Sequence, residues 1–134
     1  MMYQKIIIQE IDKPKNNKIK EDVKWICKSL GLTSGRDTEN ISFKVMCGLL
    51  EMFSETRLVS TEDLAKSLRL EPSRINHHVR CLMGSGIIFR EKRKIALRGG
   101  SLSSAIEEMK RDSEQMFNRL LEVSREIDKK LKLD

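Results

Sequence analysis

The last third of the chain carries an apolar repeat typical of a long helix with a partner. From Leu102 onward, apolar residues return at alternating steps of four and three positions, interrupted only by Ser113. This spacing forms a heptad seam and predicts one helix over residues 101–133. At about 1.5 Å per residue, such a helix is about 50 Å long, more than a small domain can cover. The seam therefore predicts a partner; it consists of Leu102, Ile106, Met109, Ser113, Met116, Leu120, Val123 and Ile127.

The positions beside this seam indicate how many helices meet there. In a simple parallel two-stranded coil, charged residues would occupy the flanking positions. Here the flanks include Ala105, Phe117 and Leu131, which widen the apolar band. We therefore expect several helices to pack together in a homodimer. The expected dimer contacts are Leu102, Ile106, Met109, Met116, Phe117, Leu120, Val123 and Ile127.

Length and composition favour a soluble protein of one domain, or of one domain with an added arm. The chain has 134 residues, of which 39% are hydrophobic, and it contains only two Pro and seven Gly. So few chain breakers favour long helices over a turn-rich all-β fold. No apolar run approaches the roughly 18 residues that cross a bilayer, and the first residues lack the features of a signal peptide. We expect a cytoplasmic protein with no membrane partner.

The cysteines and histidines predict neither a metal site nor a disulfide framework. Cys27, Cys47 and Cys81 are odd in number and widely spaced, and only His77 and His78 could add ligands. No carboxylate pair, Ser/His/Asp set or phosphate-binding glycine loop stands out. We therefore expect no enzymatic activity, no metal and no cofactor. Cys81, beside Arg80, leaves open a minor possibility of redox sensitivity.

The formal charge of +6 is unevenly distributed along the chain. Residues 1–36 carry eight basic and four acidic side chains, and residues 60–98 carry nine and four. The segments 37–59 and 99–134 are slightly acidic, at −2 and −1. A positive block inside a folded unit is a candidate phosphate-binding face. The block at 60–98 is therefore where a nucleic-acid site is expected.

Three elements and a loop are predicted for the first 54 residues. Tyr3–Ile11 is rich in β-branched residues, which predicts a short strand. Apolar residues at steps of four and three predict an amphipathic helix over Lys18–Leu30. The run TSGRDT after Gly31 predicts a loop. Asn40 can cap a helix over 41–54, which is apolar nearly all round and therefore predicted to be the central core helix.

Residues 60–86 predict two short helices joined by a turn. Ser60 and Thr61 provide a hydroxyl cap, followed by acidic residues that favour a helix N-terminus. This first helix ends near Leu70. Pro72 opens the second helix at a position that needs no amide hydrogen, and the helix stops at a Gly-Ser-Gly run. Its inward-facing residues are Ile75, Val79 and Leu82.

A hairpin with a basic tip follows. Ile87–Phe89 and Ile95–Leu97 are β-prone, and they lie on either side of the basic run Arg90–Lys94. We therefore expect a mainly α fold with a small β-hairpin wing: a winged helix-turn-helix with a long C-terminal dimerisation helix. The expected parts are an N-terminal strand–helix extension (1–36), the winged domain (37–100) and the long helix (101–134).

The run STEDLAKSLRLEPSRINHHVRCLMGSGII, residues 60–88, resembles the core of the arsenic-repressor-like (ArsR) regulators. Their typical pattern is "LA…S.STVS.HL..L..AGLV", and the resemblance extends over about residues 41–98. It is also compatible with the related MarR-like regulators. It implies a DNA-binding transcriptional regulator. The matching positions are Leu64-Ala65, Ser73, Ile75, His78-Val79, Leu82 and Gly86-Ile87-Ile88.

The chain departs from the ArsR pattern in three places. Asn76 stands where Ser is usual, and the hairpin has no Gly at its tip, so the wing is expected to be short. The family's metal sites use cysteine pairs near the third helix, or carboxylate and histidine sets on the last helix. Residues 101–134 contain neither His nor Cys. The resemblance therefore does not imply metal sensing.

A helical wheel with Ile75, Val79 and Leu82 inward separates the polar residues of the second helix. Arg80, Arg74 and Asn76 are the expected contacts to base edges in the major groove, where Arg pairs with guanine and Asn with adenine. His78 lies nearer the core and is expected to bond a backbone group. The remaining expected DNA contacts are Ser60, Thr61 and Ser73 on phosphates, outward-facing His77, and Arg90, Lys92, Arg93 and Lys94 of the wing.

The leading expectation is a homodimeric regulator that binds double-stranded DNA sequence-specifically. The alternative is a winged-helix protein-interaction module, or an architectural chromatin module without strong sequence specificity. The clustering of basic residues on one predicted face favours DNA. The operator, the direction of regulation, the effector ligand and the role of residues 1–36 stay open.

Overall fold

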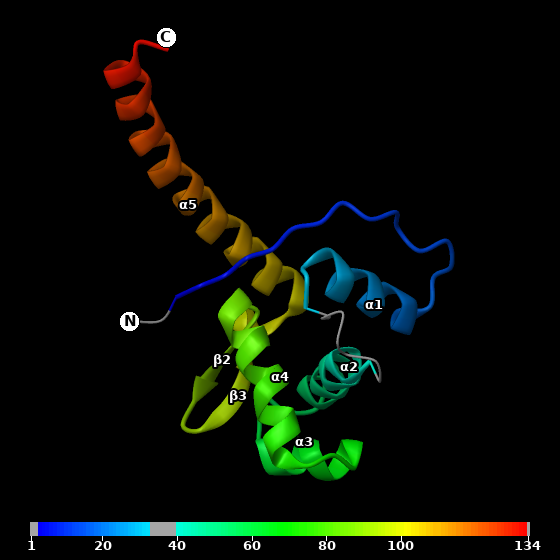
Figure 1. The fold of residues 1–134 in the computed structure, drawn as a ribbon. Helices are drawn as coiled ribbons and strands as arrows, with labels where there is room; N and C mark the ends of the chain where they lie inside the picture. Colours follow the sequence, from blue (N-terminus) through cyan, green and yellow to red (C-terminus); the bar gives the residue numbers. More distant parts are fainter. Residues whose placement is uncertain (1–2, 33–39, 134) are drawn as a thin grey trace.

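The computed structural model describes residues 3–32 and 40–133, so the TSGRDT run lies outside the described residues. The protein is mainly helical, with a small antiparallel sheet and a long last helix (Figure 1). This arrangement is consistent with a winged helix. Its elements are α1 (Ile19–Ser29), α2 (Ile41–Phe53), β1 (Leu58–Val59), α3 (Thr61–Leu68), α4 (Pro72–Ser85), β2 (Ile88–Glu91), β3 (Lys94–Leu97), the 3₁₀ turn η1 (Arg98–Gly100) and α5 (Leu102–Leu131).

Helix α2 lies at the centre of the core, as its apolar composition predicts. Val45, Met46 and Leu49 are almost completely buried, and α2 packs against α1, α3 and α4. The expected cap is wrong: Asn40 has a left-handed backbone (φ 55°), and its side chain makes no cap hydrogen bond. A capping residue needs an extended backbone to direct its side-chain oxygen at the first free amides, which explains the difference.

Helix α1 is present, but its apolar stripe is only partly used. Val23 and Cys27 form its buried line against α2. Ile19 belongs to the expected stripe, yet it is 79% exposed. The first turn of α1 therefore extends beyond the core.

Helices α3 and α4 form the expected helix-turn-helix. The Ser60 hydroxyl accepts a hydrogen bond from the amide of Asp63 at 3.0 Å, as a hydroxyl cap should. Helix α3 ends at Leu68, two residues earlier than expected, because Arg69 adopts a left-handed conformation (φ 55°). Pro72 begins α4, and Gly86 ends it with φ 94°.

The wing is the hairpin of β2 and β3, extended by a short third strand. The sheet order is β1-β3-β2, with Val59 opposite Ile95 and Arg90 also opposite Ile95 on the other side. The two-residue turn, Lys92 and Arg93, has positive φ at both positions (51° and 68°), which matches the twist of a tight hairpin. The strand β1 was not predicted, because two residues carry no periodicity.

The strand predicted over residues 3–11 is wrong. This segment, which we call the N-terminal arm, is extended but pairs with no strand. Instead, the Lys5 amide donates to the carbonyl of Gly84 at 2.8 Å, and the Gln9 amide donates to that of Ser29 at 2.7 Å. β-Branched residues favour an extended backbone, but a strand also needs a neighbouring strand, and here the arm meets two helix ends.

Helix α5 is confirmed as a single long helix, and it divides into two halves. Ser101 caps it through a hydrogen bond from the Ser104 amide. In its first turns Ala105 and Met109 are buried against the domain. Figure 1 shows the C-terminal part of α5 extending away from the other helices and strands. Apolar residues there are 46–66% exposed, namely Phe117, Leu120, Leu121, Val123, Ile127 and Leu131.

None of the helices among the described residues is both long and apolar enough to cross a membrane.

Candidate nucleic-acid interface

The outward face of α4 has the orientation that the helical wheel predicts. Ile75, Val79 and Leu82 are buried in the core. The polar residues lie on the opposite side: Ser73, Arg74, His77 and Arg80 are exposed, and Asn76 is partly exposed. This confirms which side of α4 faces solvent. The roles of these residues as DNA contacts remain a prediction.

A hollow of about 520 Å³ separates this face from the wing. It is lined by Ser73, Asn76, Arg80, Met83 and Arg90. Arg90 bridges it, because its Nη2 donates to Oδ1 of Asn76 at 3.2 Å. Its Nη1 donates to the carbonyl of Arg93 at 3.3 Å, which also ties the guanidinium to the hairpin turn. The sequence did not predict this contact between the wing and α4.

The Arg90 contact uses one acceptor position of Asn76. Reading adenine requires the amide oxygen and the amide nitrogen of Asn together. Oδ1 of Asn76 keeps a second lone pair while it accepts from Arg90, and Nδ2 remains a donor, so both groups stay available to a base.

The charge of the wing is positive on balance. Its acidic residue, Glu91, forms an ion pair with Arg57, with 2.6 Å between Nη2 and Oε2. Lys92, Arg93 and Lys94 are exposed beside it. Arg57 was not predicted, because it lies before β1, distant in sequence from the wing. The ion pair neutralises Glu91 and leaves the turn cations to set the local potential.

The two residues proposed at the start of α3 differ in exposure. Thr61 is only 7% exposed, so little of its surface can reach a phosphate. Ser60 is partly exposed, and its oxygen accepts the capping hydrogen bond from Asp63. Of these two residues, Ser60 is therefore the better placed to contact a phosphate.

His78 is partly buried rather than outward, as expected. Its Nδ1 is hydrogen bonded to the hydroxyl of Ser42 at 2.9 Å. The bond to a backbone group stays a prediction. His77 lies on the exposed side. Its ring is edge-on to the ring of His78, with 5.2 Å between the two ring centroids. The α2–α4 contact is thus polar at this point, which helps fix the rotation of α4.

The three thiols have different environments. Cys81 is exposed on α4, whereas Cys27 is fully buried and Cys47 is partly buried. Burial, with a smaller contribution from nearby Cys47, raises the pKa of Cys27 to about 12. Burial likewise raises the pKa of Cys47, and Glu51 adds to this. Cys81 is therefore the thiol that solvent reagents reach first. Among residues 3–32 and 40–133, no three His, Cys, Asp or Glu side chains are grouped to hold a metal ion.

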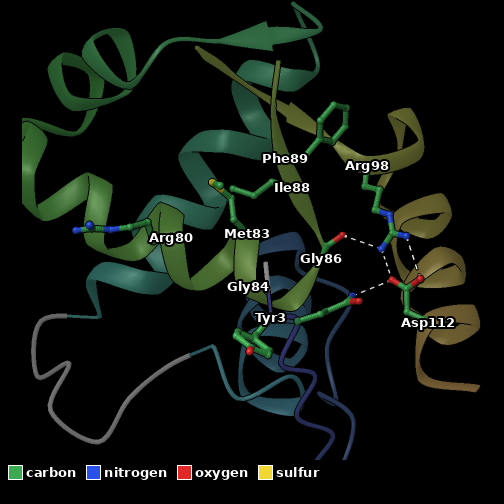
Figure 2. Close-up of a pocket in the computed structure, with 10 residues that line it drawn as sticks. Tyr3, Arg80, Met83, Gly84, Gly86, Ile88, Phe89, Arg98 and Asp112 are labelled. Carbon is green, nitrogen blue, oxygen red and sulfur yellow. Dashed lines mark hydrogen bonds and ion pairs between the residues drawn. The ribbon is translucent and has the colours of Figure 1, made fainter. Parts of the chain in front are cut away.

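A second hollow, of about 560 Å³, lies at the C-terminal end of α4 and shares Arg80 and Met83 with the first (Figure 2). Tyr3, Met83 and Phe89 contribute to its apolar lining. Its polar wall is an ion pair, seen at the right of Figure 2: the guanidinium of Arg98 donates to both carboxylate oxygens of Asp112, with Nη2 3.1 Å from Oδ1.

Further polar contacts connect this ion pair to another residue of α5, to the N-terminal arm and to the end of α4. Glu108, one turn before Asp112, pairs with Nε of Arg98 at 2.8 Å. Nε2 of Gln4 donates both to Oδ2 of Asp112 (2.8 Å) and to the carbonyl of Ser85 (3.1 Å). Nη1 of Arg98 also donates to the carbonyl of Gly86 at 3.4 Å. We call Gln4, Arg98, Glu108 and Asp112 the polar junction.

The polar junction perturbs both members of its central pair. The hydrogen bond from Arg98 lowers the pKa of Asp112, and the bond from Gln4 adds to the effect. The same bond raises the pKa of Arg98. Both groups are therefore charged at neutral pH. The sequence did not predict the junction, because its residues are spread from position 4 to position 112 and follow no motif.

The predicted dimer residues fall into two groups. Met109 is buried within its own chain, and Leu102 and Ile106 pack against the same core. Met116 is partly exposed, whereas Phe117, Leu120, Val123 and Ile127 are exposed. The surface available to a partner therefore begins about four turns into α5.

Comparison with protein-family models, curated proteins and solved structures finds no match. The function therefore has to be inferred from the geometry of α4, the wing and α5.

Proposed function

We propose that the protein is a homodimeric, DNA-binding transcriptional regulator of the ArsR-like, or less favoured MarR-like, winged-helix kind. The observation that carries this proposal is the shared orientation of two basic elements. The polar face of α4 is exposed, and the wing that stands beside it carries three exposed cations at its tip, Lys92, Arg93 and Lys94. Recognition helices in the major groove with an adjacent backbone contact have this arrangement.

Helix α4 reads the bases in this proposal. Arg80 and Arg74 lie on its exposed side, where a guanidinium can bond O6 and N7 of guanine. Asn76 pairs with adenine through Nδ2 and the second lone pair of Oδ1, while Arg90 donates to the same oxygen from the wing side.

Phosphate contacts surround this face. Lys92, Arg93 and Lys94 project from the wing turn towards the flanking backbone. Ser73 at the start of α4 and Ser60 at the start of α3 supply hydroxyls near helix N-termini, where the backbone dipoles favour an anion. These contacts position the protein on DNA, and the groove contacts supply its specificity.

The exposed half of α5 joins the two copies. Its apolar side chains would not remain in water if a second copy could cover them. A two-fold dimer places two α4 helices in successive major grooves, about 34–36 Å apart, on a pseudo-palindromic site.

The test is selection of bound duplexes from a random pool, followed by titration of selected and scrambled duplexes. We expect selected duplexes to bind at least 100-fold more tightly. Arg80→Ala should lower the affinity for the selected duplex about 10- to 100-fold, whereas Arg125→Ala, an exposed arginine far along α5, should not. Equal binding of both duplexes would favour an architectural role. Absence of DNA binding with retained dimerisation would favour the protein-interaction module.

A further inference from the structure

Helix α5 leaves the winged helix through a short glycine link. Gly99 and Gly100 have φ values of 74° and 84°, in the left-handed region that other residues rarely adopt. A Cβ at Gly99 would lie 2.7 Å from Cβ of Ser104, so the link also passes close to the first turn of α5. Arg98 stands immediately before this link, and its partners Glu108 and Asp112 stand beyond it.

Two kinds of contact hold the start of α5. Ala105 and Met109 are buried, and such apolar contact is non-directional. The carboxylates of the polar junction lie to one side of this apolar contact, with Asp112 about 40° and Glu108 about 80° round the helix from the midpoint of Ala105 and Met109. Their hydrogen bonds are directional, and the two bonds from Arg98 to Asp112 fix the plane of the guanidinium. Apolar burial keeps α5 on the domain, and the polar junction resists its tilting and rolling.

The polar junction also contacts the end of α4 directly. Gln4 bonds the carbonyl of Ser85, the last residue of α4, and Arg98 bonds the carbonyl of Gly86. Gly86 makes this approach possible, because a Cβ there would overlap the side-chain amide of Gln4. The side chains of Arg98 and Asp112 are only 29% and 22% exposed, so solvent screens their attraction less than that of a surface pair.

We propose that the polar junction sets the direction in which α5 leaves the winged helix, and thereby the separation of the two α4 helices in the dimer. Gln4, Arg98, Glu108 and Asp112 are positioning residues that determine which half-site spacing is bound. This inference rests on the proposed homodimeric, DNA-binding function.

The part of α5 between the polar junction and the exposed apolar side acts as a lever arm. A small change in the angle of the helix at the junction therefore produces a large displacement at that apolar side. Phe117, where the exposed apolar side begins, is 15 residues beyond Leu102, or about 22 Å along the helix. A tilt of about 10° at the base of α5 moves that point by about 4 Å, on the order of one base-pair step of about 3.4 Å. A modest loss of direction would therefore change the preferred spacing by about one base pair.

The first experiment measures the separation of the α4 helices without DNA. A nitroxide on Cys81 reports from α4 of each copy, in a Cys47→Ser background that leaves only buried Cys27 as a second thiol. Pulsed dipolar spectroscopy then gives the distance between copies. We expect one narrow distribution for the parent protein, a shift of several ångströms or a marked broadening for Asp112→Asn, and no change for Glu114→Gln, an exposed acid on the same helix.

The Gln4→Ala variant provides a second test of the polar junction in case Asp112→Asn does not fold. It removes the bonds to Asp112 and Ser85 without removing a charge, and it should broaden the distribution to a lesser extent. If folded Asp112→Asn and Gln4→Ala both keep the parent distribution, the inference is wrong. If the parent protein shows no distance between copies, the homodimer is wrong, and the inference is overturned with it.

The second experiment measures spacing preference on DNA. Inverted repeats of the selected half-site are made with centre-to-centre spacings that differ by single base pairs. We expect the parent protein and Glu114→Gln to prefer one spacing over its neighbours about tenfold, and Asp112→Asn to prefer it less than about threefold. An unchanged preference in Asp112→Asn would contradict the inference. Absence of binding to every duplex would refute the DNA-binding function instead, and the spectroscopic distances would still decide the role of the polar junction.

Discussion

Replacing Lys92, Arg93 and Lys94 together by Gln tests whether the wing turn contacts phosphates. All three side chains are exposed, and the hairpin places Lys92 and Arg93 in its turn and Lys94 at the start of β3. The two turn residues already have positive φ with long side chains, so Gln adds no new backbone strain. Folding and dimerisation should therefore survive, and only the charge of the turn changes.

The expected magnitude follows from counting charges. Each copy loses three cations, so a dimer loses six. The logarithm of the binding constant falls with the logarithm of salt concentration with a slope of about −0.9 per neutralised phosphate. If every wing cation contacts a phosphate, the slope of the variant should be less steep by about 5, and by about half of that if only some do. Between 50 and 200 mM salt, a change of 5 in slope corresponds to about a 1,000-fold smaller loss of affinity.

Fluorescence anisotropy titrations of a labelled selected duplex, at four or more salt concentrations, measure this slope. The matched control replaces Lys129, Lys130 and Lys132, three cations at the far end of α5, and it should leave the slope within about one unit of the parent value. A wing variant with the parent slope would refute the reasoning, because a charge that leaves the slope unchanged releases no counterion from DNA.

Three further predictions concern stability and assembly. Ser60→Ala should lower the free energy of unfolding by about 1 kcal/mol in urea titrations, because the Asp63 amide loses its cap; equal stability would contradict the cap. Ile127→Glu should shift the protein from dimer to monomer in sedimentation equilibrium, whereas its neighbour Glu126→Gln should not. Because the pKa of Asp112 is lowered in the folded state, its stabilisation is present above its unfolded pKa, near 4, and is lost as pH falls through the folded value. Asp112→Asn should therefore show a smaller decrease in melting temperature between pH 5 and pH 2 than the parent protein, and an equal decrease would contradict the ion pair.

Local patterns in the sequence predicted most of the helices and the wing. The spacing of Ile75, Val79 and Leu82 identified the buried side of α4. Pro72, the Ser60 cap and the Gly-ended turn marked the ends of α3 and α4 within two residues. These features succeeded because each depends on residues a few positions apart, where periodicity and backbone preference act directly.

Features that depend on distant residues were not predicted. The β-branched run at residues 3–11 favours an extended backbone, but whether it meets a strand or the ends of α1 and α4 depends on the whole fold. The bond between Arg90 and Asn76 joins the wing to α4 across 14 positions, and the bond between Gln4 and Asp112 spans 108. Hydrogen-bonding residues of this kind occur throughout a charged sequence, so their identity alone cannot show which of them meet.

The division of α5 links the unpredicted contacts to the proposed function. The heptad steps run without a slip along α5, yet the structure packs the first seam residues against the domain and exposes those from Leu120 onward. Any contact between copies through the exposed part is therefore separated from the base of α5 by about four turns of one helix. A rigid α5 transmits its orientation over that distance only if its base is held in direction as well as in place. The apolar contacts of Ala105 and Met109 hold the base of α5 against the domain, and the ion pair of Arg98 with Asp112 fixes the angle at which the helix leaves it.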